Sequence, residues 1–198
     1  AITLSLRDDV VWHNDAKFTA KDVATTIRLI MADDSEIQNK ERFRVIASTE
    51  IKSDFLIMIR FRQAVADPLR PLMFKIIPDG VVGSSPALKR NSTFASKPIG
   101  TGPYKFTEAS EQGEILLTAN ERYFAGATKI KNVVVKSFAD HNIMAQSLMF
   151  NSLDLITYVS PRDLGEIAGD RRLSLLPYDA LSYSFFALNN GRGLFRDK

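Results

Sequence analysis

The sequence changes character at a run in which two prolines and two glycines stand within six residues, PIGTGP from Pro98 to Pro103. Proline fixes its own backbone and glycine permits dihedral angles that other residues resist, so we expect the chain to turn here. The next residues, YKFTEA, are patterned as a β-strand. A phosphate-binding loop would need a helix at this point, because the N–H groups of a helix N-terminus hold the anion. The run therefore predicts a structural junction and argues against nucleotide binding.

The part before the junction has the pattern of a mixed α/β fold. Ile2, Leu4 and Leu6 alternate as in a strand, and the spacing of Thr19 and Asp22 is that of a helix-capping box. Four segments are predicted here after the first strand: a helix over 20–32, two strands of a hairpin over 44–53 and 55–62, and a short helix over 67–77.

The part after the junction reads as strands followed by alternating helices and strands. Predicted strands cover 103–109, 114–123, 130–138, 153–159, 172–178 and 181–190. Asp140 is the expected N-cap of a helix over 141–152, with Ile143, Leu148 and either Phe150 or Met144 facing a core. A second helix over 160–169 is expected to start with Ser160 as N-cap and Pro161 in the first turn. The fold class is therefore α/β (mixed α+β), with a break near Pro98.

Composition removes several classes of function. The chain has 198 residues, 45% of them hydrophobic, and it contains no cysteine, so disulfides, zinc–thiolate sites and thiol nucleophiles are excluded. Its histidines, His13 and His141, lie far apart, and no metal site is predicted. The net charge of +3 is scattered, which argues against nucleic acid, and no apolar run is long enough to predict insertion into a membrane.

The sequence also offers no catalytic constellation. No serine stands in a nucleophile-elbow context, and the carboxylate pairs at 8–9 and 33–34 lie in polar loops. His13 is the nearest candidate for an acid or base. We expect instead that it bonds the backbone of its own turn, while Trp12 anchors that turn in the core. The chain is thus predicted not to be an enzyme and to need no cofactor.

Four blocks of the sequence together resemble a known family. They are LSLRDDVVWHNDAKFTAKDVATTIR, KPIGTGPYKFTEASEQGEILLTANERYFAG, IKNVVVKSFADHNIMAQSLMFNSLDLI and SYSFFALNN. In this order they resemble the extracytoplasmic solute-binding proteins of ABC transporters, family 5, whose members bind peptides, nickel or oligosaccharides. The chain departs from the family pattern where Asn14 and Asp15 replace an Asp-Gly pair, and where Phe124 replaces a Trp.

The resemblance implies an architecture in which two lobes close on a ligand about a hinge. By this comparison residues 1–97 are part of a subdomain flanking the first lobe, 98–190 are the central sheet of that lobe, and 191–198 lead toward an absent second lobe. The chain is expected to be a fragment that binds ligand weakly alone, because half of the enclosing surface is missing.

The resemblance further implies the substrate-binding component of an ABC importer, which delivers a peptide-like solute to membrane permease subunits. A periplasmic or extracytoplasmic location follows, with a lipid anchor as one possibility. The expected ligand-binding residues are Asn189, with Asn190 as the alternative, and Tyr158, Val159 and Ser160 at the end of an inner strand. Two alternatives stay open: a solute-sensing module of a cytoplasmic transcription regulator, and a family member that binds nickel complexes or oligosaccharides.

Overall fold

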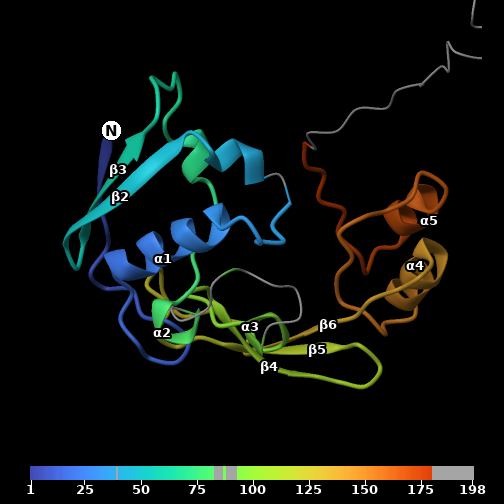
Figure 1. Ribbon diagram of the computed structural model, residues 1–198. Coiled ribbons are helices and arrows are strands. Elements are labelled where there is room, and N and C mark those ends of the chain that lie inside the picture. Colours follow the sequence, from blue (N-terminus) through green and yellow to red (C-terminus); the bar gives the residue numbers. More distant parts are fainter. Residues whose placement is uncertain (39, 83–86, 88–92, 180–198) are drawn as a thin grey trace, which may run out of the picture. The chain divides into compact units, whose positions relative to one another are not determined.

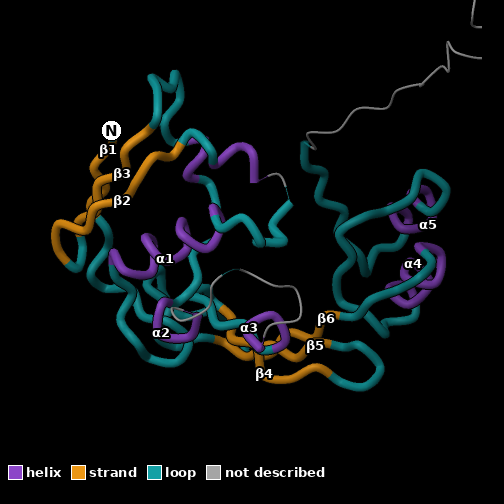
Figure 2. Tube along the Cα trace, viewed as in Figure 1, coloured by secondary structure: helices purple, strands orange, loops and turns teal. Residues whose placement is uncertain are grey.

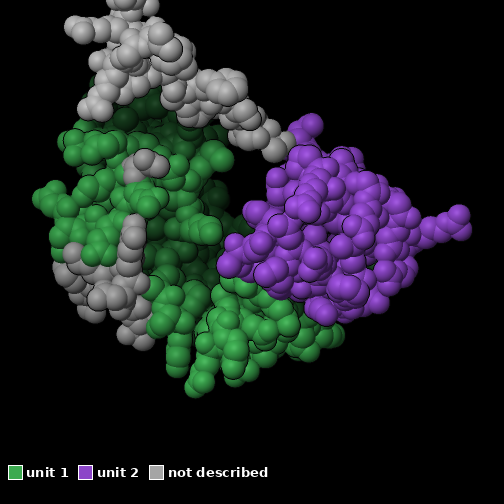
Figure 3. Space-filling view, turned by 90° about the vertical axis from the view of Figure 1, so that its right-hand side faces the viewer, with its two compact units in different colours: residues 1–137 green, residues 138–198 purple. Residues whose placement is uncertain are grey.

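The computed structural model describes residues 1–38, 40–82, 87 and 93–179. The chain divides into two compact units, residues 1–137 and 138–198, which Figure 3 shows in different colours. Helices and strands are mixed along the chain, which confirms the predicted fold class. Figure 2 separates helices, strands and loops by colour.

The first unit begins with an antiparallel sheet of three strands, β1 (Ile2–Ser5), β2 (Ile46–Ser53) and β3 (Leu56–Phe61). The strand order is β1-β3-β2, so the first strand of the chain pairs with β3 and leaves the β2–β3 hairpin intact. Figure 1 shows this sheet beside helix α1 (Ala20–Met31). The predicted hairpin and the predicted first strand are confirmed.

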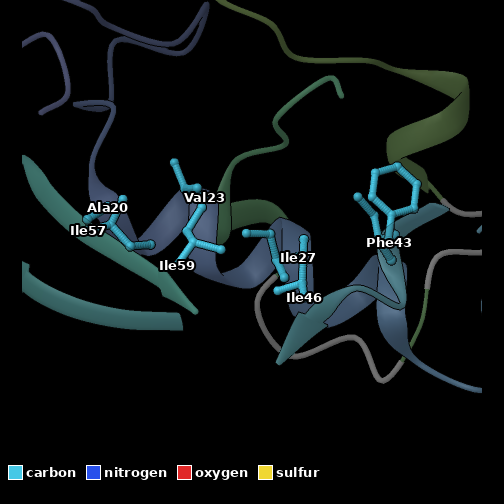
Figure 4. Packing of buried hydrophobic residues seen from close by; sticks show 8 residues of the cluster. Ala20, Val23, Ile27, Phe43, Ile46, Ile57 and Ile59 are labelled. Carbon is cyan, nitrogen blue, oxygen red and sulfur yellow. The ribbon is translucent and has the colours of Figure 1, made fainter. Parts of the chain in front are cut away.

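Helix α1 supplies one side of the main hydrophobic core. Its start is a complete capping box, in which the side chains of Thr19 and Asp22 bond each other's backbone N–H groups. Figure 4 shows the apolar face of the helix against the strands. The buried cluster joins α1, the strands and the 3-10 helix η1 (Lys40–Phe43) through Ala20, Val23, Ile27, Ile30, Phe43, Ile46, Ile57 and Ile59. Burying one such isoleucine stabilises the fold by about 1.5–3 kcal/mol.

Asp22 also holds the chain that leads to helix α2 (Asp79–Val82). Its carboxylate accepts the backbone N–H of Thr19 at 2.7 Å and that of Asp79 at 2.7 Å, although the residue is only 4% exposed. A buried carboxylate must be paired in this way to avoid a large desolvation cost. The preceding segment is not the helix predicted over 67–77. Only the 3-10 turn η2 (Arg70–Leu72) forms there, and both Pro68 and Pro71 lack the N–H that a helix needs.

A second antiparallel sheet follows α3 (Thr93–Ser96) in the same unit. It contains β4 (Tyr104–Ala109), β5 (Ile115–Ala119) and β6 (Asn132–Val135) in the order β4-β5-β6, and Gly113 takes a positive φ of 81° in the first connection. The three predicted strands are confirmed. The predicted junction at Pro98 falls inside the first unit, between its two sheets. The division into 1–97, 98–190 and 191–198 stays a prediction.

In the second unit, the described part contains α4 (His141–Met149) and α5 (Leu164–Gly169). Asp140 caps α4 as predicted, since its side chain accepts the N–H of Asn142 at 2.7 Å. The predicted core face is confirmed for Leu148, which is buried with Ala145, and wrong for Ile143, which is 54% exposed. Of the two alternatives, Met144 is half-buried and Phe150 is 79% exposed.

Two of the predicted strands do not form in the second unit. The segments 153–159 and 172–178 have no ladder of backbone hydrogen bonds to any described neighbour, so neither is a strand. Helix α5 starts at Leu164, later than predicted, although Ser160 does open the turn that leads into it. The predicted strand over 181–190 lies outside the described residues. In the part of the chain that is described, no helix has the length and apolar character needed to cross a bilayer.

Candidate functional site

The described surface of the second unit contains a groove with a volume of about 900 Å³. Its walls are the two extended segments 154–159 and 172–178, and Leu148 of α4 and Ile167 of α5 also line it. Both of these side chains are buried, at 7% and 3% exposure. The short helices thus act as the packed support, and the extended segments present their side chains to the groove.

A hydrogen bond joins the two walls of the groove. The hydroxyl of Tyr178 donates to the backbone carbonyl of Thr157 at 3.1 Å. This bond satisfies one carbonyl of a segment that has no strand partner, and it fixes the position of the Tyr178 ring. The two walls of the groove are therefore in direct contact.

Aromatic and aliphatic side chains dominate the lining. Tyr158 is half exposed, and its ring lies against that of His141, with 4.9 Å between the ring centroids and a tilt of 52°. Leu155, Leu176 and Tyr178 are each more than 70% exposed. Exposed apolar groups gathered around a concavity mark a binding surface more often than a plain solvated one.

The charges at the groove are few and largely balanced. Asp154 and Arg172 are the charged members among the described lining residues. Arg172 pairs with Asp170 at 2.6 Å and lowers the pKa of that carboxyl to about 2. Its guanidinium also donates to the carbonyl of Met149 at the C-terminal end of α4, where a positive charge is favourable. The groove therefore offers little net charge to a ligand.

The structure brings some of the predicted site residues together. Tyr158 and Val159 both line the groove. Ser160 does not, because its hydroxyl donates to Asp163 Oδ2 at 2.7 Å and its carbonyl accepts from Asp163 and Leu164. Asn189 and Asn190 lie outside the described residues. The role of all five in ligand binding stays a prediction.

Several groove residues were missed by sequence reasoning. Arg172, Leu175, Leu176 and Tyr178 were assigned only to the predicted strand over 172–178. The signal available was the apolar run LLPY, with a proline that resists continued pairing in a sheet. The sequence could not reveal that Tyr178 bonds the carbonyl of Thr157, 21 positions earlier.

The histidine weighed as an acid or base is bound on both sides. His13 Nδ1 accepts the backbone N–H of Gly100 at 3.1 Å, and Nε2 lies 3.1 Å from the carbonyl oxygen of Gly102. The expectation that it bonds its own turn was wrong, because its partners belong to the PIGTGP run. Trp12 is 2% exposed, as expected for a core anchor. Among the described residues no cluster of three histidine or acidic side chains could hold a metal ion.

Comparison with known proteins relates the chain to solute-binding proteins. The family model described as bacterial extracellular solute-binding proteins, family 5 Middle, matches residues 1–198. The oligopeptide-binding protein AppA of Bacillus subtilis is 26% identical over the whole chain, and the chain covers 37% of that protein. Di/tripeptide-binding protein 4 of Pseudomonas aeruginosa is 31% identical over 94 residues, which are 48% of this chain and 18% of that protein.

Solved structures of solute-binding proteins have a fold similar to that of this chain. NikZ from Campylobacter jejuni in complex with Ni(L-His) has a TM-score of 0.77 and 27% identity, and the match covers 85% of this chain and 34% of that one. AppA from Bacillus subtilis in complex with a nonapeptide has a TM-score of 0.71 and 25% identity, over 76% of this chain and 31% of that one. The match with AppA of Bacillus subtilis includes the whole of this chain but only 37% of AppA. The chain thus spans little more than a third of the length of such relatives.

Proposed function

The chain belongs to the bacterial extracellular solute-binding proteins, family 5, and from this we propose that it is part of the substrate-binding component of an ABC importer. The observation that carries the proposal is the family match over all 198 residues. The solute is peptide-like, in keeping with the relatives named for binding oligopeptides and di- or tripeptides. The protein delivers it to membrane permease subunits and works outside the cytoplasm, with or without a lipid anchor.

The groove in the second unit is the part of this chain that we assign to the solute. Its apolar lining and balanced charge suit peptide side chains, while the backbone groups of its two extended segments suit the peptide main chain. Tyr158 and Val159 contact the solute in this assignment. Asn189 and Asn190 supply amides to its main chain, as the family resemblance implies. Ser160, which holds the turn that leads into α5, stays a predicted contact of the solute.

The domain assignment belongs to the same proposal. Residues 1–97 flank the first lobe, 98–190 form its central part, and 191–198 lead toward the other lobe. Support comes from the first sheet ending before Pro98 and from the second sheet beginning after it. Ligand enclosure then requires both lobes, so the 198 residues alone bind weakly.

A second candidate solute is a nickel complex with an amino acid. It is favoured by the likeness to NikZ, whose structure contains Ni(L-His). A chelate brings its own ligands to the metal, so it needs no protein cluster of histidines or carboxylates. The named peptide-binding relatives favour an importer over the transcription-regulator alternative.

Thermal-shift screening of the full-length protein that contains this chain tests the proposal. The panel holds di-, tri- and nonapeptides, Ni(L-His) and oligosaccharides. A peptide at a hundred times its Kd stabilises the native state by about 2.7 kcal/mol, because it binds the folded form alone. We expect a rise in Tm with at least one peptide class. A rise with an oligosaccharide and with no peptide would refute the peptide assignment.

A further inference from the structure

The ring of His13 is held in one defined protonation state by its two partners. The N–H of Gly100 can only donate, so Nδ1, 3.1 Å away, must be unprotonated. The carbonyl of Gly102 can only accept, so Nε2, at 3.1 Å, must carry the proton. The ring is therefore neutral, with its hydrogen on Nε2. A proton added to Nδ1 would face the N–H of Gly100, donor against donor.

A backbone hydrogen bond and close packing also join His13 to the PIGTGP run. The N–H of His13 donates to the carbonyl of Gly100 at 2.8 Å, so the turn and the glycine run are bonded twice on one side. A Cβ atom at Gly100 would lie 3.3 Å from Cε1 of His13, which is closer than ordinary packing allows. Asn120 Nδ2 donates to the same Gly102 carbonyl at 3.0 Å. The ring thus fits a site shaped around its neutral form.

Burial and nearby charge act in the same direction. Partial burial lowers the pKa of His13 below its ordinary 6.5, the Gly102 carbonyl raises it by less, and Lys105 on β4 lowers it further. The loop after β5 adds Arg122, which pairs with Asp15 of the histidine's own turn at 2.8 Å and is thereby neutralised. Other charged residues on the packed segments are Lys17, Lys97 and Glu121.

We propose that His13 is a pH-sensitive clasp, which in its neutral form holds the PIGTGP run to the turn at 12–15 and loosens that run when the ring is protonated. The two segments are 87 positions apart in the chain and connect the region of the first sheet to the start of the second. The loop after β5 also joins the two segments, because Asn120 bonds Gly102 of the run and Arg122 pairs with Asp15 of the turn. Protonation of the ring therefore loosens the junction locally and does not unfold the unit.

The sign of the effect on stability follows from linkage. A histidine whose pKa is lower in the folded state binds protons more readily in the unfolded chain. Its contribution is fully present above pH 6.5 and is lost as the pH falls from 6.5 through the lower folded value. The junction is therefore tightest at pH 7 and above.

Nuclear magnetic resonance on the unaltered chain tests the clasp directly. We expect ring ¹⁵N shifts of His13 at pH 8 that report the Nε2–H form, and a titration midpoint below 6.5. The amide resonance of Gly100 should move with the same midpoint, because its acceptor disappears on protonation. The idea is overturned if His13 shows the Nδ1–H form, or titrates at or above 6.5.

A substitution separates the clasp from general pH effects. In the variant His13→Asn, the asparagine offers an acceptor near Gly100 but does not titrate. The urea concentration at the unfolding midpoint falls between pH 7.5 and pH 5 in the wild type, and we expect the fall in the variant to be less than half as large. The matched control is His141→Asn, which removes the chain's other histidine and should keep the wild-type drop. An unchanged drop in His13→Asn would contradict the proposal, and the resonance titration decides the matter should that variant fail to fold.

Discussion

At the scale of single residues, the tightest constraint is the absence of a side chain at Gly100. Gly100→Ala places a Cβ 3.3 Å from the His13 ring, whereas Gly102→Ala meets nothing within 4 Å. Because the ring is bonded at both nitrogens, it cannot move aside freely. We expect Gly100→Ala to be less stable than Gly102→Ala by about 1–2 kcal/mol in urea unfolding. Equal stability of the two variants would show that the ring is not fixed as described.

A second residue-scale prediction concerns Tyr158 in the groove. Its half-exposed ring is supported by His141 and is free to cover an apolar group of a bound solute. Tyr158→Ala should weaken peptide binding by about 1–2 kcal/mol, as loss of an aromatic contact does at other binding surfaces. Calorimetric titration of the full-length protein measures this change.

The control for that titration is Phe150→Ala. Phe150 is 79% exposed and does not line the groove, so its loss should leave peptide affinity unchanged. Equal weakening by both substitutions would mean that the effect is not specific to the groove.

At the scale of elements, the start of α1 is the best-defined local structure. Thr19→Ala removes the hydroxyl that accepts the N–H of Lys21 at 3.3 Å, and it should cost about 1 kcal/mol of stability. Thr19→Ser keeps the hydroxyl and should restore most of that loss. Chemical denaturation of the three proteins checks the order wild type, Ser, Ala. A serine variant as unstable as the alanine variant would argue against the cap.

The elements that could be predicted from sequence are those whose determinants are local. Thr19 and Asp22 carry the start of α1, and Asp140 carries the start of α4. The 44–62 hairpin follows from two apolar runs with a short polar connection. The segments 153–159 and 172–178 have similar strand-like patterns, but a strand also requires a neighbour, and no described segment pairs with them. Pattern alone could not reveal that.

The candidate site was predictable only in part, for the same reason. Tyr158 and Val159 were reached through a family resemblance, and they do line the groove. The opposite wall was not reached, because the Tyr178–Thr157 bond joins residues 21 positions apart. The partners of His13 lie 87 and 89 positions away, so local turn chemistry led to the wrong bond.

At the scale of the whole molecule, the chain corresponds to one part of the longer solute-binding proteins that it resembles. Its first unit contains the main core and the His13 junction, and its second unit contains the groove. The family match covers both units, while the chain spans about 37% of AppA. We propose that the groove at 154–159 and 172–178 receives a peptide-like solute.

Photocrosslinking tests that claim most directly. A nonapeptide with a benzophenone side chain is bound to the full-length protein, and the complex is irradiated. The crosslinked residues are then located by peptide mass mapping. A parallel sample contains an excess of unlabelled peptide as competitor. We expect adducts within 154–159 or 172–178 that the unlabelled peptide suppresses. Competable adducts confined to other parts of the protein, or labelling that the unlabelled peptide does not suppress, would contradict it.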